Sequence, residues 1–388
     1  MTRRQLENGD LKMSKFYVVL MTVSLHSSAV LGQKWQVTAI TDGSQRVEAP
    51  RVSGSSVAWQ QYDGHDWEIY LYDGSTIKQL TDNDVDDTVP DVSNGHVAWK
   101  RGDYDDTDIV YNGITIMEGV KNNTDMKLEP GGLIWSAATA PGSVDHVYLF
   151  DGTSTKKLSV AGTYANHNPA MSGNKVVWSS FKNGENSAYL YDGTSSVQLP
   201  ENVGLGQVPQ ISGNNIVGVG IDADGIHDQV FLYDGVTNKP LGNTSGHDLH
   251  PKIAGQNVAW SSCVGNVCEI FTFQGGQAKQ LSFNSVRTYA PLVSETLVVY
   301  NVHDGVDFDI YIYDGLSSVR FTDNDLADSL YDISDNTFVW TQIGRNRSQI
   351  LMATYVVPES TSLMLLVFGA TMMRLHRPAS YYRVPLVT

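Results

Sequence analysis

Apolar and polar residues alternate over short stretches along most of this chain, which is the pattern of β-strands rather than of helices. In residues 50–82 the pattern predicts four short strands, at residues 50–53, 57–60, 68–72 and 77–81, separated by a Gly54-Ser55 turn, an acidic loop and an Asp73-Gly74 turn. Ile69 and Leu71 point to one side of the third strand, and Tyr70 and Tyr72 point to the other. Both faces of the predicted sheet are therefore apolar, and both must be covered.

This unit of about 40 residues occurs eight times along the chain. Its first motif, Pro-x-x-Ser-Gly-x-x-Val-Ala-Trp, occupies residues 50–59, 90–99, 169–178 and 251–260, and looser copies end at Trp135, Gly218, Tyr300 and Trp340. Its second motif, Tyr-Asp-Gly or a close variant, follows the first seven copies at residues 72–74, 111–113, 150–152, 191–193, 233–235, 273–275 and 313–315. A β-propeller covers both faces of such sheets by packing blade against blade, whereas no 3.6-residue apolar period supports a helical solenoid. The sequence therefore predicts an all-β fold, a single β-propeller.

The two ends of the repeat array predict how the propeller closes. Residues 37–42 match the outer-strand motif of residues 78–82, yet no inner strands precede them, and residues 331–340 and 349–355 form inner strands without an outer strand. Pairing the two ends completes an eighth four-stranded blade and removes two open sheet edges. We therefore predict eight blades, with seven as the alternative if the weak third repeat around residues 131–135 is irregular.

Composition agrees with one large all-β domain and narrows its partners. The 35 Gly and 13 Pro suit a fold with many turns, and 41% hydrophobic residues suffice for a continuous core. A net charge of −16 argues against DNA, RNA and anionic membrane surfaces, which attract clustered Lys and Arg. We expect a monomer with no nucleic-acid partner, and membrane association only through the C-terminal tail before that tail is processed.

Residues 1–32 are typical of a signal peptide. Lys15 precedes an apolar run at residues 16–25, and small or medium-sized residues precede a suitable cleavage point before Gln33. The residues before Met13 are polar and charged, which is consistent with a true start at this methionine.

The C-terminal residues resemble a PEP-CTERM sorting signal, the segment that an exosortase processes in Gram-negative and related bacteria. Pro358-Glu359 is followed by an apolar run at residues 363–373 and a basic cluster at residues 374–377. Ser360 replaces the second Pro of that motif, and the apolar run would span only about 16 Å of a hydrocarbon core of roughly 30 Å. A sorting signal and a plain hydrophobic tail are therefore both open. The predicted organisation is a signal peptide at residues 1–32, the propeller at residues 33–356 and this tail at residues 357–388.

The two cysteines, Cys263 and Cys268, stand on either side of a short Val-Gly-Asn-Val turn. Partners across an antiparallel hairpin bring their Cβ atoms to about 4.5–5.5 Å, which local adjustment closes to disulfide distance. A zinc site would need two further ligands at a suitable spacing, and the sequence offers none. We predict a disulfide and an oxidising compartment.

The repeats resemble those of TolB-type propellers. Pro-x-x-Ser-(x)-Gly-x-x-Val-Ala-Trp, Glu-Ile-Tyr-Leu-Tyr-Asp-Gly and Lys-Gln-Leu-Thr-Asp stand where that family has Ser-Pro-Asp-Gly, Ile-Tyr and Gln-Leu-Thr, and the likeness covers residues 35–355. Ser-Gly replaces Ser-Pro-Asp-Gly in this chain. The resemblance implies a periplasmic or surface scaffold for protein or glycan contacts.

Acidic residues gather in the loops that join the second strand to the third and one blade to the next. Loops of these two kinds emerge on one face of a propeller, and they carry Asp63, Asp66, Glu68, Asp82, Asp84, Asp86, Asp87, Asp222, Asp224, Asp304, Asp307, Asp309, Asp323, Asp325 and Asp328. Oxygen ligands at alternating positions suit Ca²⁺, which makes candidate ligands of Asp82, Asp84, Asp86, Asp222, Asp224, Asp323 and Asp325. No loop completes an EF-hand pattern, and Asp and Asn also form ordinary turns, so structural turns are the alternative to Ca²⁺ as a cofactor.

A second set of candidate ligand-binding residues lies two positions before each blade, near the mouth of the predicted channel. The set consists of Glu48, Thr88, His167, Gln207, Leu249 with its neighbour His250, Tyr289 and Ser329. These residues differ from blade to blade and are mostly polar. Such an asymmetric ring suits one small ligand, and a water-filled channel is the alternative.

Motifs for catalysis are missing from the sequence. It has no Gly-x-Ser-x-Gly nucleophile elbow, no sialidase Asp box and no quinoprotein docking motif. Two carboxylates of the acidic face, scattered in sequence, leave a carbohydrate-active enzyme of glycosidase or lyase type as the alternative. We expect no catalytic residue and an exported binding or scaffold module for protein or glycan. We expect it in the periplasm, on the outer surface or in the extracellular matrix of a Gram-negative-type bacterium.

Overall fold

The computed structural model describes residues 35–356, apart from short gaps at residues 104–105, 122–124, 141, 160–164, 183, 201–204, 224, 243–245, 284–287, 289–290 and 345–346. The signal peptide predicted at residues 1–32, the start at Met13 and the tail at residues 357–388 lie outside the described residues. The described part consists of strands and connecting turns, and it contains no helix long and apolar enough to cross a membrane.

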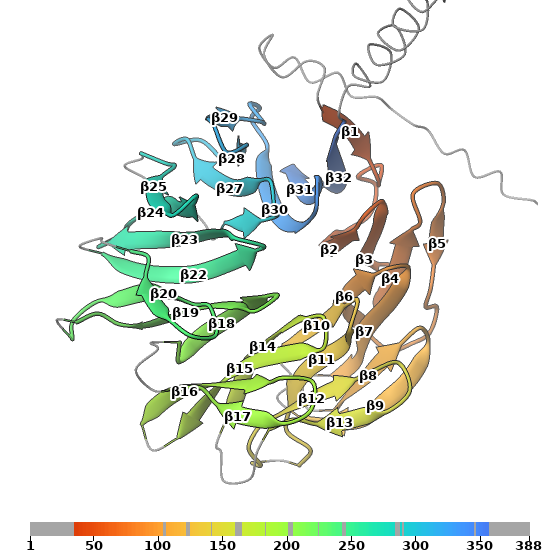
Figure 1. Cartoon of the computed structure of the whole chain (residues 1–388). Coiled ribbons are helices and arrows are strands. Elements are labelled where there is room, and N and C mark those ends of the chain that lie inside the picture. Colours follow the sequence, from red (N-terminus) through yellow and green to blue (C-terminus); the bar gives the residue numbers. More distant parts are fainter. Residues whose placement is uncertain are drawn as a thin grey trace, which may run out of the picture.

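The described strands form a ring of eight four-stranded blades (Figure 1). The first four blades are β2 (Val47–Ser53), β3 (Ser56–Tyr62), β4 (Trp67–Tyr72) and β5 (Ile77–Gln79); β6 (Asp87–Ser93), β7 (His96–Asp103), β8 (Asp106–Tyr111) and β9 (Ile114–Val120); β10 (Met126–Glu129), β11 (Gly132–Ala137), β12 (His146–Phe150) and β13 (Thr155–Lys157); and β14 (Asn166–Ser172), β15 (Lys175–Lys182), β16 (Glu185–Tyr191) and β17 (Ser196–Gln198).

The remaining four blades continue in chain order until the last one, which takes its outer strand from the beginning of the described chain. They are β18 (Gln207–Ser212), β19 (Asn215–Ile221), β20 (Asp228–Tyr233) and β21 (Asn238–Pro240); β22 (His247–Ala254), β23 (Asn257–Val264), β24 (Val267–Gln274) and β25 (Gln277–Gln280); β26 (Leu292–Val293), β27 (Val298–His303), β28 (Phe308–Tyr313) and β29 (Ser318–Arg320); and β30 (Ala327–Ser334), β31 (Thr337–Gly344), β32 (Arg347–Tyr355) and β1 (Trp35–Ala39). The predicted count of eight is confirmed, because the weak third repeat forms the complete blade β10 to β13.

Strand β1 closes the ring. It pairs antiparallel with β32, beginning with Trp35 opposite Tyr355, and Figure 1 shows the red β1 beside the dark blue β32. Trp35 anchors the strand, since its ring meets those of Phe321, Phe338 and Tyr355 edge to face at centroid distances of 5.2 to 5.5 Å. The predicted closure is confirmed, with the strand beginning two residues earlier than predicted.

The Val-Ala-Trp motif places large rings in the core. The second-strand ring stacks on the aromatic ring opposite it in the third strand at 5.6 to 5.8 Å in five blades: Trp59 on Tyr70, Trp135 on Tyr148, Trp178 on Tyr189, Trp260 on Phe271 and Tyr300 on Tyr311. The other face of each sheet packs on the next blade, as Ala58 and Ile69 do against Trp99. Both apolar faces are therefore covered, as the alternation of residues predicts.

The serine of the first repeat motif links neighbouring blades. It ends the first strand of its blade, and its hydroxyl accepts a hydrogen bond from a turn N–H of the next blade. These bonds of 2.8 to 3.2 Å run to Ser53 from Asn94, to Ser172 from Gly213, to Ser212 from Gly255 and to Ser334 from Gly54. The serine thus stabilises the junction between blades, including the junction of the eighth blade with the first.

The Tyr-Asp-Gly motif builds the turn between the third and fourth strands. In the first blade, Asp73 Oδ1 accepts the N–H groups of Ser75 and Thr76 at 3.1 and 2.9 Å. Gly74 has a φ of +95°, which glycine adopts without strain, and its carbonyl accepts the hydroxyl of Tyr72 at 2.8 Å. The three residues of the motif therefore act as one turn-forming unit.

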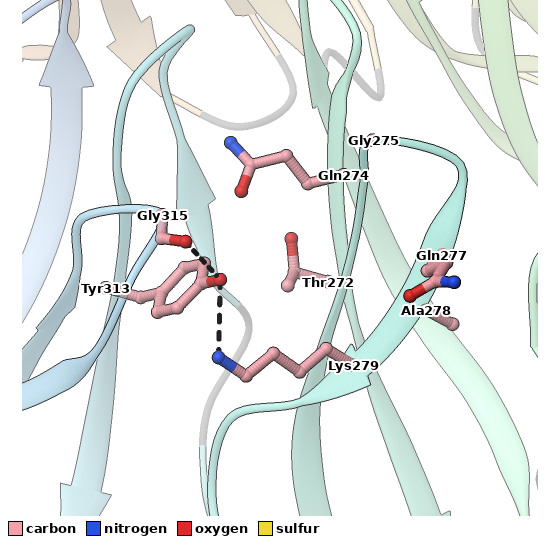
Figure 2. A pocket seen from close by; sticks show the side chains of 8 residues that line it. All are labelled: Thr272, Gln274, Gly275, Gln277, Ala278, Lys279, Tyr313 and Gly315. Atoms are coloured by element: carbon pink, nitrogen blue, oxygen red, sulfur yellow. Dashed lines mark hydrogen bonds between the residues drawn. The ribbon is translucent and has the colours of Figure 1, made fainter.

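A lysine of the fourth strand packs on the aromatic ring that begins the Tyr-Asp-Gly motif of the next blade. Lys156 lies over Tyr191, Lys239 over Phe273 and Lys279 over Tyr313, with the ammonium nitrogen 4.4 to 4.7 Å from the ring centroid. Such cation–π contacts contribute roughly 0.5–1 kcal/mol each at exposed sites. Figure 2 shows the third of them in a pocket of about 400 Å³, where the Tyr313 hydroxyl also donates to the Gly315 carbonyl. This pocket lies where two neighbouring blades meet.

Cys263 and Cys268 form the predicted disulfide across the β23–β24 hairpin. They lie directly opposite each other in the register of the two strands. The bond closes a loop with a sequence separation of only 5, so it restricts the unfolded chain little.

Replacing Trp35 by Ala tests the ring closure. Loss of three edge-to-face contacts is expected to lower the free energy of unfolding by roughly 2–4 kcal/mol and to expose the edge of β32 to aggregation. Thermal unfolding and light scattering measure the two effects, with Gln36→Ala at an exposed position of the same strand as the control. Equal melting temperatures for the two variants would contradict a closing role for β1.

The disulfide is expected to be formed in protein purified without reductant. Thiol titration in denaturant should then detect free cysteine only after reduction. Replacing both Cys263 and Cys268 by Ser should lower the free energy of unfolding by about 2 kcal/mol or less, because the closed loop is short. Free thiols in the unreduced protein would show that the hairpin forms without a covalent link.

Candidate functional site

The first strands of the blades face the axis of the ring and line a central cavity of about 970 Å³. Residues of β2, β6, β10, β14, β18, β22, β26 and β30 form its wall. The cavity extends to the turns after these strands, where Gly54, Asn94 and Asp335 belong to its lining. A cavity of this size, formed before any ligand arrives, is typical of small-ligand sites.

Charged side chains of both signs line this central cavity. Arg51, Lys127 and Lys252 are positive, and Asp91, Asp125, Glu129, Asp332 and Asp335 are negative. They come from different blades, so a ring of similar units carries an asymmetric pattern of charge. Such a lining favours a polar ligand held in one orientation.

The next blade holds two of these acids in place. Asp91 Oδ2 accepts the N–H of Leu128 at 2.8 Å, and Asp332 Oδ2 accepts the N–H of Val52 at 2.9 Å. Each carboxylate therefore bridges two blades while it faces the cavity. The positions of these two charges are fixed by the backbone around them.

Five of the first strands bend at the residue before their proline. Ala49, Val89, Asn168, Val208 and His250 have φ between +45° and +53°, and a β-bulge lies at the same place in each strand. L-residues rarely adopt this conformation, β-branched valine least of all. The N–H of Val89 donates to Gln60 Oε1 of the preceding blade at 2.8 Å, which helps to hold the strained backbone. Proline fits at such a bulge because it has no N–H to contribute to the sheet.

Burial in the cavity wall shifts the acids and the lysine in opposite directions. Desolvation raises the pKa of Asp91 to about 6 and also raises the pKa of Glu129. Desolvation lowers the pKa of Lys252 to about 8, and repulsion from Lys127 and Arg51 adds to this shift. The ionised forms are therefore poorly solvated, which is a common property of binding sites.

The predicted channel-mouth residues do not line this cavity. Glu48, Thr88, His167, Gln207, His250 and Ser329 lie on the first strands toward the acidic loops, and Tyr289 lies outside the described residues. Thr88, His167 and Gln207 directly precede lining residues of the bulges. The cavity thus begins one residue beyond this set and continues away from it.

At the acidic end of the first blade, the loop between β3 and β4 gathers three carboxylates. Asp63, Asp66 and Glu68 each offer an oxygen, and these oxygens lie within 4.8 Å of one another. Asp63 Oδ1 accepts the N–H groups of His65 and Asp66 at 2.7 and 3.2 Å, which shapes the loop. Burial and the charge of Asp63 raise the pKa of Asp66, and burial raises the pKa of Glu68.

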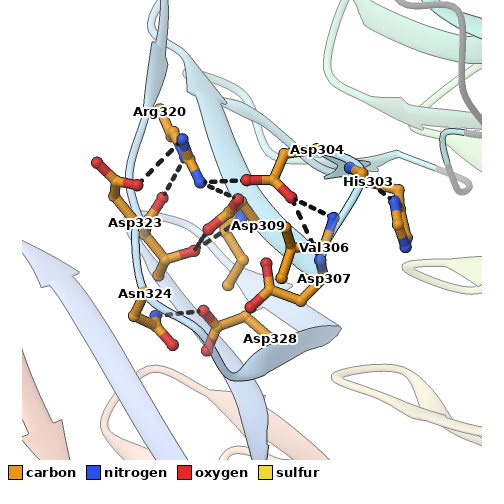
Figure 3. Close-up of polar contacts among 12 residues, drawn as sticks. His303, Asp304, Val306, Asp307, Asp309, Arg320, Asp323, Asn324 and Asp328 are labelled. Atoms are coloured by element: carbon orange, nitrogen blue, oxygen red, sulfur yellow. Dashed lines mark hydrogen bonds and ion pairs between the residues drawn. The ribbon is translucent and has the colours of Figure 1, made fainter.

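The loop between β27 and β28 repeats this cluster with Asp304, Asp307 and Asp309. Here Arg320 of β29 lies among the acids. Its guanidinium pairs with Asp304 at 2.9 Å, with Asp323 at 3.0 Å and with Asp309. Figure 3 shows this fan of ion pairs beside the Asp307 carboxylate. Burial raises the pKa of Asp309, and Arg320 opposes that shift.

None of the described residues predicted as Ca²⁺ ligands belongs to these clusters; those of residues 82–86 and 323–325 are in the loops that follow the same blades, and Asp222 is in the β19–β20 loop of another blade. Among the described residues, only the two acidic trios just described are close enough to hold one ion. Asp86 Oδ1 accepts the Trp67 N–H at 3.0 Å, Asp222 Oδ1 accepts the Ile226 N–H at 3.1 Å, and Asp323 pairs with Arg320. Asp82, Asp84 and Asp325 are exposed loop residues, and Asp224 lies outside the described part.

The sequence feature that marks the cavity, and that the predicted site residues did not include, is the residue after the motif proline. It is Arg51, Asp91, Gln210 or Lys252 in four of the repeats, and these side chains meet at the axis. The missed signal for the acidic trios was Asp-Gly-x-Asp-x-Glu or Asp at residues 63–68 and 304–309. Both signals are variations between copies of the repeat.

Comparison with models of known protein families finds no match, and comparison with curated protein sequences finds none either. Solved structures do match. Oligopeptidase B from Trypanosoma brucei is 10% identical at a TM-score of 0.57, over 77% of this chain and 52% of its own, so this chain spans about half its length. The β-propeller domain of the Trilobed protease from Pyrococcus furiosus is 16% identical at 0.52, over 72% of this chain and 98% of that one. A protein of Agrobacterium tumefaciens assigned as TolB is 13% identical at a TM-score of 0.37, over 53% of this chain and 84% of its own. At these identities the first two show the propeller fold alone.

The pKa of Asp91 predicts a dependence of stability on pH. An Asp of the unfolded chain has a pKa of about 4, whereas the pKa of Asp91 in the folded protein is about 6. Asp91 therefore binds its proton more tightly in the folded protein than in the unfolded chain. Ionised Asp91 therefore destabilises the fold, and this effect grows as the pH rises from about 4 to about 6 and is constant above.

Asp91→Asn removes the charge and keeps an oxygen that accepts the Leu128 N–H. The stability of the variant relative to the native chain should increase as the pH rises from about 4 to about 7, by up to roughly 3 kcal/mol. Urea unfolding at the two pH values measures the gain, with the exposed Asp335→Asn on the cavity rim as the control. A difference that does not change with pH would contradict the assignment.

Proposed function

We propose that this chain is an exported, non-catalytic β-propeller that binds a polar protein segment or a glycan in its central cavity. The observation that carries the proposal is the cavity lining, where Arg51, Asp91 and Lys252 bring both signs of charge to a space of about 970 Å³. Poorly solvated charges gain when a ligand supplies hydrogen-bonding partners. Sugar hydroxyls and peptide groups can donate to the acids and accept from the bases.

Export is supported by two independent features. The Cys263–Cys268 disulfide is typical of proteins from oxidising compartments. The sequence of residues 1–32 is typical of a signal peptide, and residues 357–388 suit a sorting signal or a hydrophobic tail. On this proposal the protein works in the periplasm, on the outer surface or in the extracellular matrix of a Gram-negative-type bacterium.

A carbohydrate-active enzyme is the weaker alternative. Glycosidases use two carboxyl groups about 5–9.5 Å apart that face one substrate. The acids of the trio Asp63, Asp66 and Glu68 offer oxygens within 4.8 Å of one another, and two of the three residues are buried. Such crowding suits a shared counter-ion better than a bound sugar.

Glycan and peptide arrays probed with the purified full chain test the proposal, with and without EDTA. Lys252→Met removes one of the positive charges of the cavity lining and keeps a similar length of side chain, and the exposed Lys157→Met on β13 is the control. We expect binding to one polar class, with at least a tenfold loss of affinity in Lys252→Met and little change in Lys157→Met. Equal binding by both variants would move the site away from the cavity, and cleavage of a bound glycan would replace the proposal by the enzyme.

A further inference from the structure

The β3–β4 loop buries negative charge that no described lysine or arginine neutralises. Asp66 is 7% exposed and Glu68 is 0% exposed. Both oxygens of Asp66, and Oε2 of Glu68, have no hydrogen-bond partner. One oxygen of each of these residues and one of Asp63 lie within 4.8 Å of one another. Buried carboxylates without partners are strongly destabilising, and three of them together also repel one another.

No described lysine or arginine forms an ion pair with these three acids. Arg46 lies over the ring of Trp67 but pairs with Glu48. The next loop adds more negative charge, because Asp84 and Asp86 act on Asp66 through space. A positively charged partner would therefore stabilise this site, and no described lysine or arginine provides one.

A second copy of the same loop carries a cation that pairs with two of its three acids, while both oxygens of Asp307, the counterpart of Asp66, have no hydrogen-bond partner there either. Residues 304–309 repeat the Asp-Gly-x-Asp-x-acid pattern of residues 63–68, and Thr-Asp-Asn-Asp follows in both copies, at residues 81–84 and 322–325. In the second copy Arg320 pairs with Asp304 and Asp309 (Figure 3).

The strand register identifies the residue that stands in place of Arg320 in the first copy. Arg320 lies opposite Tyr311, and Gln79 lies opposite the equivalent Tyr70. Gln79 is neutral and exposed. The first copy thus has the same acids and backbone pattern but lacks the built-in cation.

We propose that Asp63, Asp66 and Glu68 bind one divalent cation of the size and hardness of Ca²⁺. Carboxylate oxygens are the ligands that Ca²⁺ prefers, at about 2.3–2.6 Å, so oxygens on one ion lie up to about 5 Å apart. The trio offers three oxygens within 4.8 Å of one another, which is compatible with that geometry. Mg²⁺ needs shorter, near-octahedral contacts and keeps most of its water, so it fits this buried trio less well.

Hydrogen bonds from the backbone hold two of the ligands ready. The N–H of Asn83 donates to Glu68 Oε1 at 2.7 Å, and Oε2 is buried without a hydrogen-bond partner. The turn bonds of Asp63 fix the other end of the loop. The cation would therefore join the β3–β4 hairpin to the loop that leads into the second blade, and it would stabilise this junction.

The test is calcium binding and thermal unfolding of the purified full chain. Isothermal titration with CaCl₂ should detect one tightly bound ion per chain, with much weaker binding of MgCl₂. Calcium should raise the melting temperature by roughly 2–5 °C above the value in EDTA at matched NaCl. Asp66→Asn should weaken calcium binding at least tenfold and abolish that rise, whereas Asp325→Asn, an exposed acid of the second copy, should leave both unchanged.

Two exchanges between the copies sharpen the test. Gln79→Arg should introduce the missing counter-ion, so that the protein in EDTA becomes more stable and calcium no longer binds. Arg320→Gln should open the second trio and raise the stoichiometry from one calcium ion to two.

Identical melting curves in calcium, EDTA and NaCl would overturn the proposal, as would unchanged calcium affinity in Asp66→Asn. A fold that is stabilised by acid and indifferent to calcium would show that a shared proton neutralises the trio instead.

Discussion

Each blade of this chain is a sheet with two apolar faces, and the rest of the structure depends on covering both. In the first blade Trp59 and Tyr70 belong to one buried cluster, and Ala58 and Ile69 belong to the next. Exposure of either face would forfeit roughly 25 cal/mol for every Å² of apolar surface. A closed ring gives every sheet two neighbours, and the pairing of β1 with β32 completes the last sheet. The closure holds the ring together, and the serine and lysine contacts between neighbouring blades stabilise it further.

The same closure creates the central cavity. Because the first strands converge on one axis, residues about 40 positions apart in the chain become neighbours there. Bulges before the prolines leave backbone N–H groups that need acceptors from the adjoining blade, as Gln60 provides for Val89. Asp91 combines both roles, since it accepts a backbone N–H of the next blade and still presents a charge to the cavity. The proposed binding site is therefore built from the contacts that also hold the blades together.

The acidic loops illustrate how a repeat protein changes charge without changing its backbone. The trio of the first blade and the trio of the seventh have the same spacing, and in both the first Asp accepts the N–H groups two and three positions further on. A single position on the fourth strand differs between them: Arg320 pairs with two of the three acids in the seventh blade, and the neutral Gln79 stands at the same place in the first. Comparison of copies within one chain thus supplies the control that the proposal needs.

The sequence by itself determined the fold class, the eight blades, the ring closure and the disulfide. These features follow from strand alternation, turn residues and a hairpin around Cys263 and Cys268, all of which are local and repeated. It also placed the acidic residues on one face, because loop order in a blade settles that. It did not reveal that Asp66 is buried without a partner while Asp84 is exposed, or that Asp91 and Lys252 line one cavity. Only the tertiary structure decided these points, because burial and distances between blades depend on how the twisted sheets pack around the axis.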